Sequence, residues 1–234
     1  MANGKKQKNM AYIKSVRNHT PEVGEGTFVA ETAVLIGDVT VGKDSSLWYN
    51  VVLRGDVNKI TIGDRTNIQD GTVIHTLYDK SPKPSQTHIG NDVSVGHNAT
   101  IHGAIIEDNC LIGMGATILD NAVVASGCII AANALVLSNS KLEPNSVYAG
   151  VPAKKVKEVT PEQRETIIQR IANDYRLYAS WYEEEKKLKK IQSYEIQTTT
   201  QIPYRVVYIS GIGYQSDCQL LVYVADGGKS VGRN

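Results

Sequence analysis

The chain has 234 residues, 41% of them hydrophobic, so it can bury a substantial core as one domain or two. Its 25 basic and 24 acidic residues leave a formal charge of +1, which provides no global field for nucleic acid and favours a small-molecule partner. The three cysteines form neither a disulfide framework nor a CxxC zinc pattern, no apolar run is long enough for a membrane span, and residues 1–10 lack an apolar signal core. We therefore expect a cytoplasmic protein that binds neither membrane nor nucleic acid.

A six-residue repeat follows the polar extension over residues 1–10. Aliphatic residues recur with this period at Leu35, Val41, Leu47, Leu53, Ile62, Ile68, Ile74, Ile89, Val95, Ile101, Ile106, Ile112, Ile118, Val124, Ile130 and Val136. Glycine often comes next, as expected where short strands turn tight corners. The period predicts an all-β solenoid over residues 11–153, in which three hexads make one coil and the aliphatic side chains stack inside.

Two interruptions of the period predict loops at about 55–60 and 76–88, and loops on a rigid scaffold often carry functional sites. When the extra residues are subtracted, Arg54, His75 and His102 lie one coil apart. We therefore expect these three side chains to stack on one face of the solenoid.

A second face carries Gln69, Asp70 and His97, because the same subtraction places His97 one coil after Asp70. Stacked coils lie about 4.8 Å apart, so His75 and His102 can bind one metal ion together, whereas His97 points from another face. A neighbouring subunit must then supply His97. Three solenoids packed around an axis close these contacts into a ring, so we expect a homotrimer with three equivalent sites.

A helix is predicted after the repeat, with Thr160 as its cap, Pro161 at its first position and Gln163 completing a capping box. An apolar stripe comes next, at Ile167, Ile171, Tyr175, Tyr178 and Tyr182. We expect a C-terminal α-helix over residues 158–190 that packs along the solenoid. Residues 191–234 hold two apolar runs, which fit either a β-hairpin or an extension without assigned structure.

Three histidines are a minimal set for a catalytic zinc site, because three neutral imidazoles leave the fourth position to water and lower its pKa toward neutrality. A single histidine is more often an ordinary hydrogen-bonded group, which is our interpretation of His19 and His88. His75, His97 and His102 instead agree with the coil spacing. We identify them as candidate metal ligands.

The candidate site resembles the γ-class carbonic anhydrases over residues 11–185, in Arg54-Gly55-Asp56, in Asn67-Ile68-Gln69-Asp70-Gly71, and in His75, His97 and His102. The resemblance implies a left-handed parallel β-helix that forms a homotrimer, with two histidines from one subunit and one from its neighbour. It also implies bound Zn²⁺, with Fe²⁺ or Co²⁺ as alternatives. The implied activity is the reversible hydration of CO2 to bicarbonate by a metal-bound hydroxide at the trimer interfaces.

The resemblance also assigns roles to the polar residues around the histidines. Gln69 and Asn67 are expected to orient the hydroxide, since an amide oxygen can accept its proton in a hydrogen bond. Arg54 is expected to pair with Asp70 across the subunit boundary, while Asp56 braces the arginine. We interpret Arg54, Asp56 and Asp70 as an interface ion-pair group that maintains the subunit contact, in preference to a direct role in catalysis, because a bidentate ion pair fixes geometry well.

The sequence departs from the well-characterised active enzymes of that family at two acidic positions, where Val57 and Tyr78 stand instead. Tyr78 thus occupies a candidate catalytic position. Neither valine nor a tyrosine with an ordinary pKa of about 10 is suited to relay a proton at neutral pH. We expect slow turnover, unless Asp79 or buffer substitutes for the relay.

Two other functions remain open from the sequence. A metal-dependent thioesterase or hydrolase would use the same hydroxide, and a fold alone does not choose between the two reactions. A non-catalytic, metal-stabilised assembly subunit is the alternative that the missing acids favour. Hexapeptide acyltransferases share the solenoid, but no histidine here stands in an obvious acceptor site without also being a candidate metal ligand.

Overall fold

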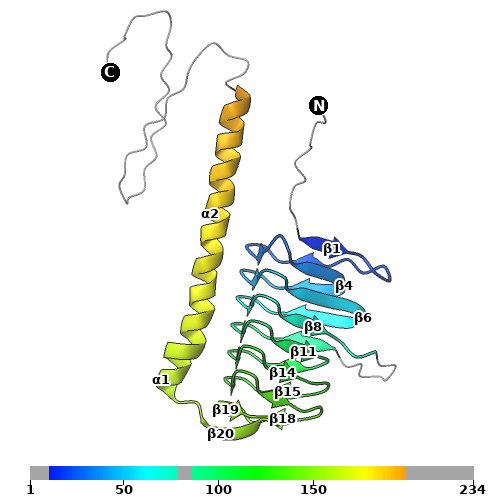
Figure 1. Ribbon diagram of the computed structural model, residues 1–234, viewed down its shortest axis with the longest axis vertical. Helices are drawn as coiled ribbons and strands as arrows, with labels where there is room; N and C mark the ends of the chain where they lie inside the picture. Colours follow the sequence, from blue (N-terminus) through cyan, green and yellow to red (C-terminus); the bar gives the residue numbers. More distant parts are fainter. Residues whose placement is uncertain (1–10, 79–85, 199–234) are drawn as a thin grey trace, which may run out of the picture. The chain divides into compact units, whose positions relative to one another are not determined.

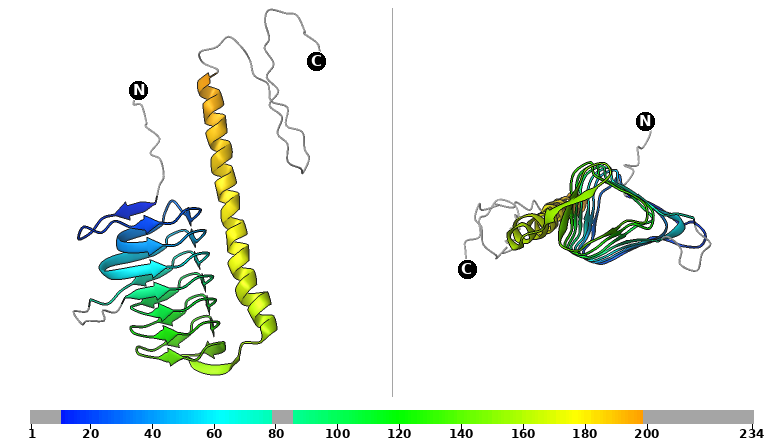
Figure 2. Two further views of the ribbon diagram at one scale, coloured as in Figure 1. Left: turned by 180° about the vertical axis from the view of Figure 1, so that it is seen from behind. Right: turned by 90° about the horizontal axis from the view of Figure 1, so that it is seen from below.

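The computed structural model describes residues 11–78 and 86–198, and it forms a parallel β-solenoid followed by a C-terminal helix (Figure 1). Seen along the stack of coils, the solenoid has a triangular outline (Figure 2). The hexapeptide prediction is therefore confirmed. No helix in the described ranges combines the length and apolar character that a membrane crossing requires.

One face of the solenoid is an eight-stranded sheet. Its strands are β3 (Phe28–Val29), β5 (Ser46–Leu47), β7 (Asn67–Ile68), β10 (Ser94–Val95), β13 (Leu111–Ile112), β16 (Ile129–Ile130), β19 (Ser146–Ala149) and β20 (Lys154–Glu158). All of them pair in parallel except β20, which runs antiparallel to β19 at the end of the stack.

The other two faces form one twelve-stranded sheet, because β4 (Val34–Val41) and β6 (Val52–Ile62) run across the corner between them. One of these faces continues with β1 (Tyr12–Lys14), β8 (Val73–His75), β11 (Thr100–His102), β14 (Thr117–Ile118) and β17 (Leu135–Val136). The other contains β2 (Glu22–Val23), β9 (Thr87–Ile89), β12 (Ile105–Ile106), β15 (Val123–Val124) and β18 (Lys141–Leu142).

The core is made of the repeating aliphatic side chains, which are stacked in register from coil to coil. In one column Leu53 pairs with both Leu35 and Ile74, and Ile74 pairs with Ile101 in the next coil, and all four are fully buried. Each coil therefore buries the apolar surface of its neighbour, which stabilises the stack through the hydrophobic effect.

The corner at Gly71 fixes the direction of the chain between the two expected site faces. Gly71 has φ +72°, and a Cβ added there would lie 2.3 Å from Asn98 Oδ1 in the next coil. Only glycine tolerates both the left-handed backbone and this close approach. The corner follows Asp70 directly, so it helps to hold that carboxylate beside the adjacent coil.

The expected loop at 55–60 is wrong in form, because these residues belong to strand β6. The three extra residues are taken up as a bulge, where the pairing changes from Gly37–Gly55 to Val39–Ile60. The predicted loop at 76–88 ends earlier than expected, since Thr87 and His88 lie in β9. Residues 79–85, including Asp79, lie outside the described part of the chain.

The C-terminal helix begins with the predicted capping box. Gln163 N donates to Thr160 Oγ1 at 3.1 Å, and Thr160 N donates to Gln163 Oε1 at 3.2 Å. The helical segments are α1 (Pro161–Gln163), the π-helical η1 (Arg164–Gln169) and α2 (Arg170–Thr198). The helix therefore continues past the expected end at 190, and the hairpin predicted after it falls largely on residues 199–234, which are not described.

The first part of α2 packs along the solenoid as its apolar stripe predicts. The Tyr175 ring meets Trp48 edge-on, with their centroids 5.4 Å apart, and Tyr178 and Ala179 pack on the same cluster around Phe28. These contacts place the α2 residues up to Ser180 in one compact unit with the solenoid. The part of α2 up to Ser180 thus forms one wall beside the eight-stranded sheet.

Candidate metal centre

The register of the strands confirms the predicted stacking of Arg54, His75 and His102. Arg54 in β6 pairs with His75 in β8, and His75 pairs with His102 in β11. Parallel pairing within a solenoid places equivalent side chains on the same face. The two histidines therefore project from neighbouring coils toward the same region.

Each of these two histidines contacts a carboxylate and the other histidine. His75 Nε2 lies 3.0 Å from Asp56 Oδ1, and His102 Nδ1 lies 2.5 Å from Asp120 Oδ1. The remaining ring nitrogens, His75 Nδ1 and His102 Nε2, are 3.0 Å apart. The four side chains thus form a line from Asp56 to Asp120.

The carboxylates determine which ring nitrogen of each histidine carries the proton. An ionised carboxylate only accepts hydrogen bonds, so neutral His75 is protonated at Nε2 and neutral His102 at Nδ1. Two unprotonated nitrogens then face each other at 3.0 Å, where neither can donate to the other. A cation between the two nitrogens would satisfy both lone pairs, so this arrangement fits a metal ligand pair.

The spacing of the two nitrogens also fits a metal. A tetrahedral zinc site with Zn–N distances of about 2.0–2.1 Å separates two ligand nitrogens by about 3.3 Å. The 3.0 Å between His75 Nδ1 and His102 Nε2 is close to this separation. Metal-binding histidines commonly donate their other N–H to a carboxylate, as His75 and His102 do here.

The third expected ligand, His97, lies at the corner after β10 and belongs to the other predicted face. Its Nδ1 is 2.9 Å from Asp70 Oδ2, and its Nε2 is 3.3 Å from the Tyr175 hydroxyl. The same carboxylate argument leaves the lone pair of neutral His97 on Nε2. Within the described residues of one chain, no three histidine, cysteine or acidic side chains gather into a metal-binding group.

Tyr175 is protonated at neutral pH and can donate to His97. Burial raises the pKa of Tyr175 to about 12, and the nearby Asp70 carboxylate acts in the same direction. The hydroxyl therefore keeps its proton and directs it at His97 Nε2. The contact orients the His97 ring from the α2 side, and a metal ion bound at Nε2 would replace the tyrosine proton on the single lone pair of that nitrogen.

The ionisation of the Asp56–His75 pair suits a neutral imidazole ligand. Burial alone would raise the pKa of Asp56, but the hydrogen bonds from Arg54 and His75 outweigh it and hold this pKa below its usual value. Burial lowers the pKa of His75, and the positive charge of Arg54 lowers it further against the opposing effect of Asp56. An anionic Asp56 beside a neutral His75 is the state that metal binding needs.

Gln69 and Asn67 form a buried hydrogen-bonded chain next to the His97 face. Gln69 Nε2 donates to Asn67 Oδ1 at 3.0 Å, and Asn67 Nδ2 donates to Ser94 Oγ at 2.8 Å. All three residues are buried. Because the Gln69 nitrogen is held by Asn67, its carbonyl oxygen is left to accept a hydrogen bond from elsewhere.

The other predicted site residues are placed as follows. Arg54 Nη1 donates to Asp56 Oδ2 at 2.7 Å in the same chain, and Asp70 is engaged by His97. The pairing of Arg54 with Asp70 across a subunit boundary stays a prediction. The side chain of Tyr78 is 57% exposed.

Two residues that contact the histidines were missed by the sequence analysis. Asp120 lies 18 residues after His102, which is the coil length, so a search for carboxylates one coil further along would have found it. The apolar stripe of the helix predicts only a packing role for Tyr175. Its contact with His97 joins residues 78 positions apart, and spacing along the solenoid carries no signal for it.

Asp120→Asn should weaken zinc affinity about 10-fold to 100-fold, because an amide can offer its NH2 group to His102 Nδ1 and favour the wrong tautomer. Competition with a chromogenic chelator measures the change. Asp38→Asn is a matched control, since Asp38 lies 3.7 Å from His19, which is not an expected ligand. Equal affinities for Asp120→Asn and the unaltered protein would show that Asp120 does not orient a ligand.

Comparison with known proteins agrees with this fold. The family model described as bacterial transferase hexapeptide (six repeats) matches residues 86–120 and 103–138. A structure described as a hexapeptide transferase family protein from Anaplasma phagocytophilum has a TM-score of 0.68 and 36% identity, covering 73% of this chain and 98% of its own. The chain is thus a hexapeptide-repeat β-solenoid protein.

Two curated relatives define the family more narrowly. The probable carbonic anhydrase of Methanocaldococcus jannaschii is 55% identical over 62% of this chain and 88% of its own length. Gamma carbonic anhydrase 2 of Arabidopsis thaliana, a mitochondrial protein, is 40% identical over 64% of this chain, and the match spans only 55% of that relative. The chain belongs to the γ-carbonic-anhydrase-like hexapeptide-repeat family.

Proposed function

We propose that this protein catalyses the reversible hydration of CO2 to bicarbonate, with Zn²⁺, Fe²⁺ or Co²⁺ held between the subunits of a homotrimer. The observation that carries the proposal is the set of three ring nitrogens whose lone pairs are set by carboxylates: His75 Nδ1, His102 Nε2 and His97 Nε2. The curated relatives named carbonic anhydrase support the same reaction.

The geometry supports a site shared between subunits. His75 and His102 face each other on one side of the solenoid, whereas His97 is engaged by Asp70 and Tyr175 beside the other sheet. A three-ligand site therefore needs His97 from a second copy, as closed cyclic assembly provides. When bound by three neutral imidazoles, a zinc ion supplies hydroxide at neutral pH by lowering the pKa of water.

The chain's own residues would perform the remaining tasks. Asp56, Asp120 and Asp70 hold the histidines in the tautomer and orientation for binding. Gln69, anchored through Asn67, presents its carbonyl oxygen to the attacking water and aligns it toward the carbon of CO2. Arg54 holds Asp56 in place from the side opposite His75.

Stopped-flow measurement of CO2 hydration on anaerobically purified protein, with metal analysis of the same sample, tests the proposal. We expect measurable hydration that disappears on metal removal and returns on reloading. A panel of esters and thioesters run beside it tests hydrolysis as the alternative reaction. A fully metal-loaded protein without hydration would instead favour the non-catalytic assembly subunit.

Turnover should depend on buffer concentration. Val57 has no ionisable group and Tyr78 has no carboxylate, so neither position supplies the acidic proton relay expected there. At fixed pH and ionic strength, kcat should rise several-fold with an imidazole-type buffer, while kcat/KM stays nearly constant. Val57→Glu should raise kcat in weak buffer and change little in strong buffer. A kcat that is insensitive to buffer would place the slow step elsewhere.

A further inference from the structure

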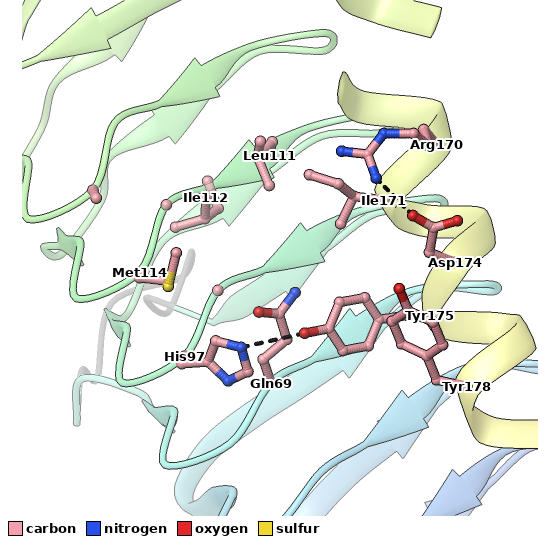
Figure 3. Close-up of a pocket in the computed structure, with 13 residues that line it drawn as sticks. Gln69, His97, Leu111, Ile112, Met114, Arg170, Ile171, Asp174, Tyr175 and Tyr178 are labelled. Atoms are coloured by element: carbon pink, nitrogen blue, oxygen red, sulfur yellow. Dashed lines mark hydrogen bonds and ion pairs between the residues drawn. The ribbon is translucent and has the colours of Figure 1, made fainter. Parts of the chain in front are cut away.

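A cavity of about 340 Å³ lies between α2 and the eight-stranded sheet (Figure 3). Its sheet wall includes Leu111, Ile112 and Met114, and its helix wall includes Ile171 and Tyr178. The volume falls in the range of pockets that hold small organic molecules, and three-atom CO2 would fill only a small part of it. The proposed reaction therefore leaves most of this space without a role.

Except for the Tyr178 hydroxyl, the polar side-chain groups of the cavity lie at its two ends, with the apolar walls between them (Figure 3). One end carries Gln69, His97 and the Tyr175 hydroxyl. The other end carries Arg170 and Asp174, whose Nη1 and Oδ2 atoms form an ion pair at 2.7 Å. Because these two charges compensate each other, no unpaired charge there would offset the desolvation of a charged ligand.

We infer that this cavity binds a neutral carbonyl compound with an unbranched apolar tail, whose carbonyl lies at the Gln69 end. Gln69 Nε2 donates one hydrogen to Asn67 Oδ1, and the amide carries a second N–H that can donate to a ligand carbonyl. At roughly 30 Å³ per non-hydrogen atom, the size of one water in the liquid, the cavity holds roughly ten such atoms. A tail of about six carbons therefore fits along the apolar walls. This binding requires neither a metal nor CO2 hydration.

Met114 provides a direct readout of occupancy. It lines the cavity, and the chain has three methionines, of which Met1 and Met10 precede the described residues. In protein labelled with ¹³C-methyl methionine, titration with 2-octanone should shift the Met114 resonance saturably. The resonance is assigned with Met114→Leu.

The choice of ligands tests the tail and the head group separately. Each buried CH2 group strengthens binding about fourfold, so 2-pentanone, with three fewer, should bind weaker by on the order of 50-fold. Heptanoate keeps the same six-carbon tail but carries a charge, so it should bind at least several-fold more weakly than 2-octanone. Equal affinities for the three compounds, or a Met114 resonance that does not move up to the solubility limit of the ketone, would overturn the inference.

Two substitutions on the same helix locate the binding site. Ile171→Trp places a larger side chain into the cavity and should abolish the Met114 shift. Leu177→Trp makes the same kind of change at a position that is 53% exposed and does not line the cavity, so the shift should remain. Retention of the shift in folded Ile171→Trp would contradict the location. If that variant does not fold, the affinities of 2-octanone and 2-pentanone for the unaltered protein, measured through the Met114 resonance, decide whether the cavity binds the ligand.

Discussion

Mixing His75→Ala subunits with His97→Ala subunits should restore metal binding that neither variant has alone. In a trimer of either variant, every site lacks one ligand. In a mixed trimer, one contact joins the intact His75/His102 pair of a His97→Ala subunit to the intact His97 of a His75→Ala subunit. Random mixing in equal amounts makes about three quarters of the trimers mixed. Each mixed trimer has one complete metal site out of three, so about a quarter of the wild-type metal content should return.

The matched control combines His75→Ala with His102→Ala, which remove ligands from the same face. Every subunit of such a trimer lacks either His75 or His102, so no subunit contact contains all three ligands. This mixture should therefore stay without metal. Metal content is measured on refolded mixtures after size-exclusion chromatography. Mixed trimers that form but bind no metal, or a control that recovers equally, would exclude the shared site.

The sequence predicts the solenoid and the stacking of its histidines because both depend on one rigid quantity, the length of a coil. The aliphatic period places Leu53, Ile74 and Ile101 in one buried column, and the residues that follow them must then stack as well. Arg54, His75 and His102 directly follow these three positions. Their register is therefore a consequence of the core.

The form of an insertion does not follow from its length. Three extra residues after Gly55 can leave the sheet as a loop or remain in the strand as a bulge, and both restore the period. Here β6 keeps its pairing with β4 and then with β9, so the strand crosses the corner without a loop. Hydrogen bonding with two neighbours decides between the outcomes, and residue spacing does not record it.

The partners of the histidines show a similar limit. Apolar spacing predicts which side of α2 faces the solenoid, and Tyr175 packs on Trp48 accordingly. The same spacing does not predict the position of the Tyr175 hydroxyl. Its contact with His97 is therefore known only from the structure. Asp120 is an intermediate case, because its position one coil after His102 follows from the coil length, whereas its contact with His102 Nδ1 does not.

Gln69→Ala should lower kcat for CO2 hydration by on the order of 100-fold while metal content and assembly stay unchanged, because removing one positioned polar group from an acyl-transfer site has an effect of this size. The Gln69 nitrogen is tied to Asn67 at 3.0 Å and Asn67 is tied to Ser94 at 2.8 Å, so the carbonyl oxygen of Gln69 has a fixed direction. Its loss removes the acceptor that aligns the attacking water, whereas none of the three expected metal ligands is changed.

Ser94→Ala loosens the same chain of hydrogen bonds at its far end and should reduce kcat much less, which makes it the matched control. Stopped-flow kinetics in strong buffer separates this effect from proton export, since the aligned attack is reflected in kcat/KM, which should fall in parallel with kcat. A Gln69→Ala protein that retains full kcat/KM with its metal bound would assign Gln69 to the packing of the His97 face alone.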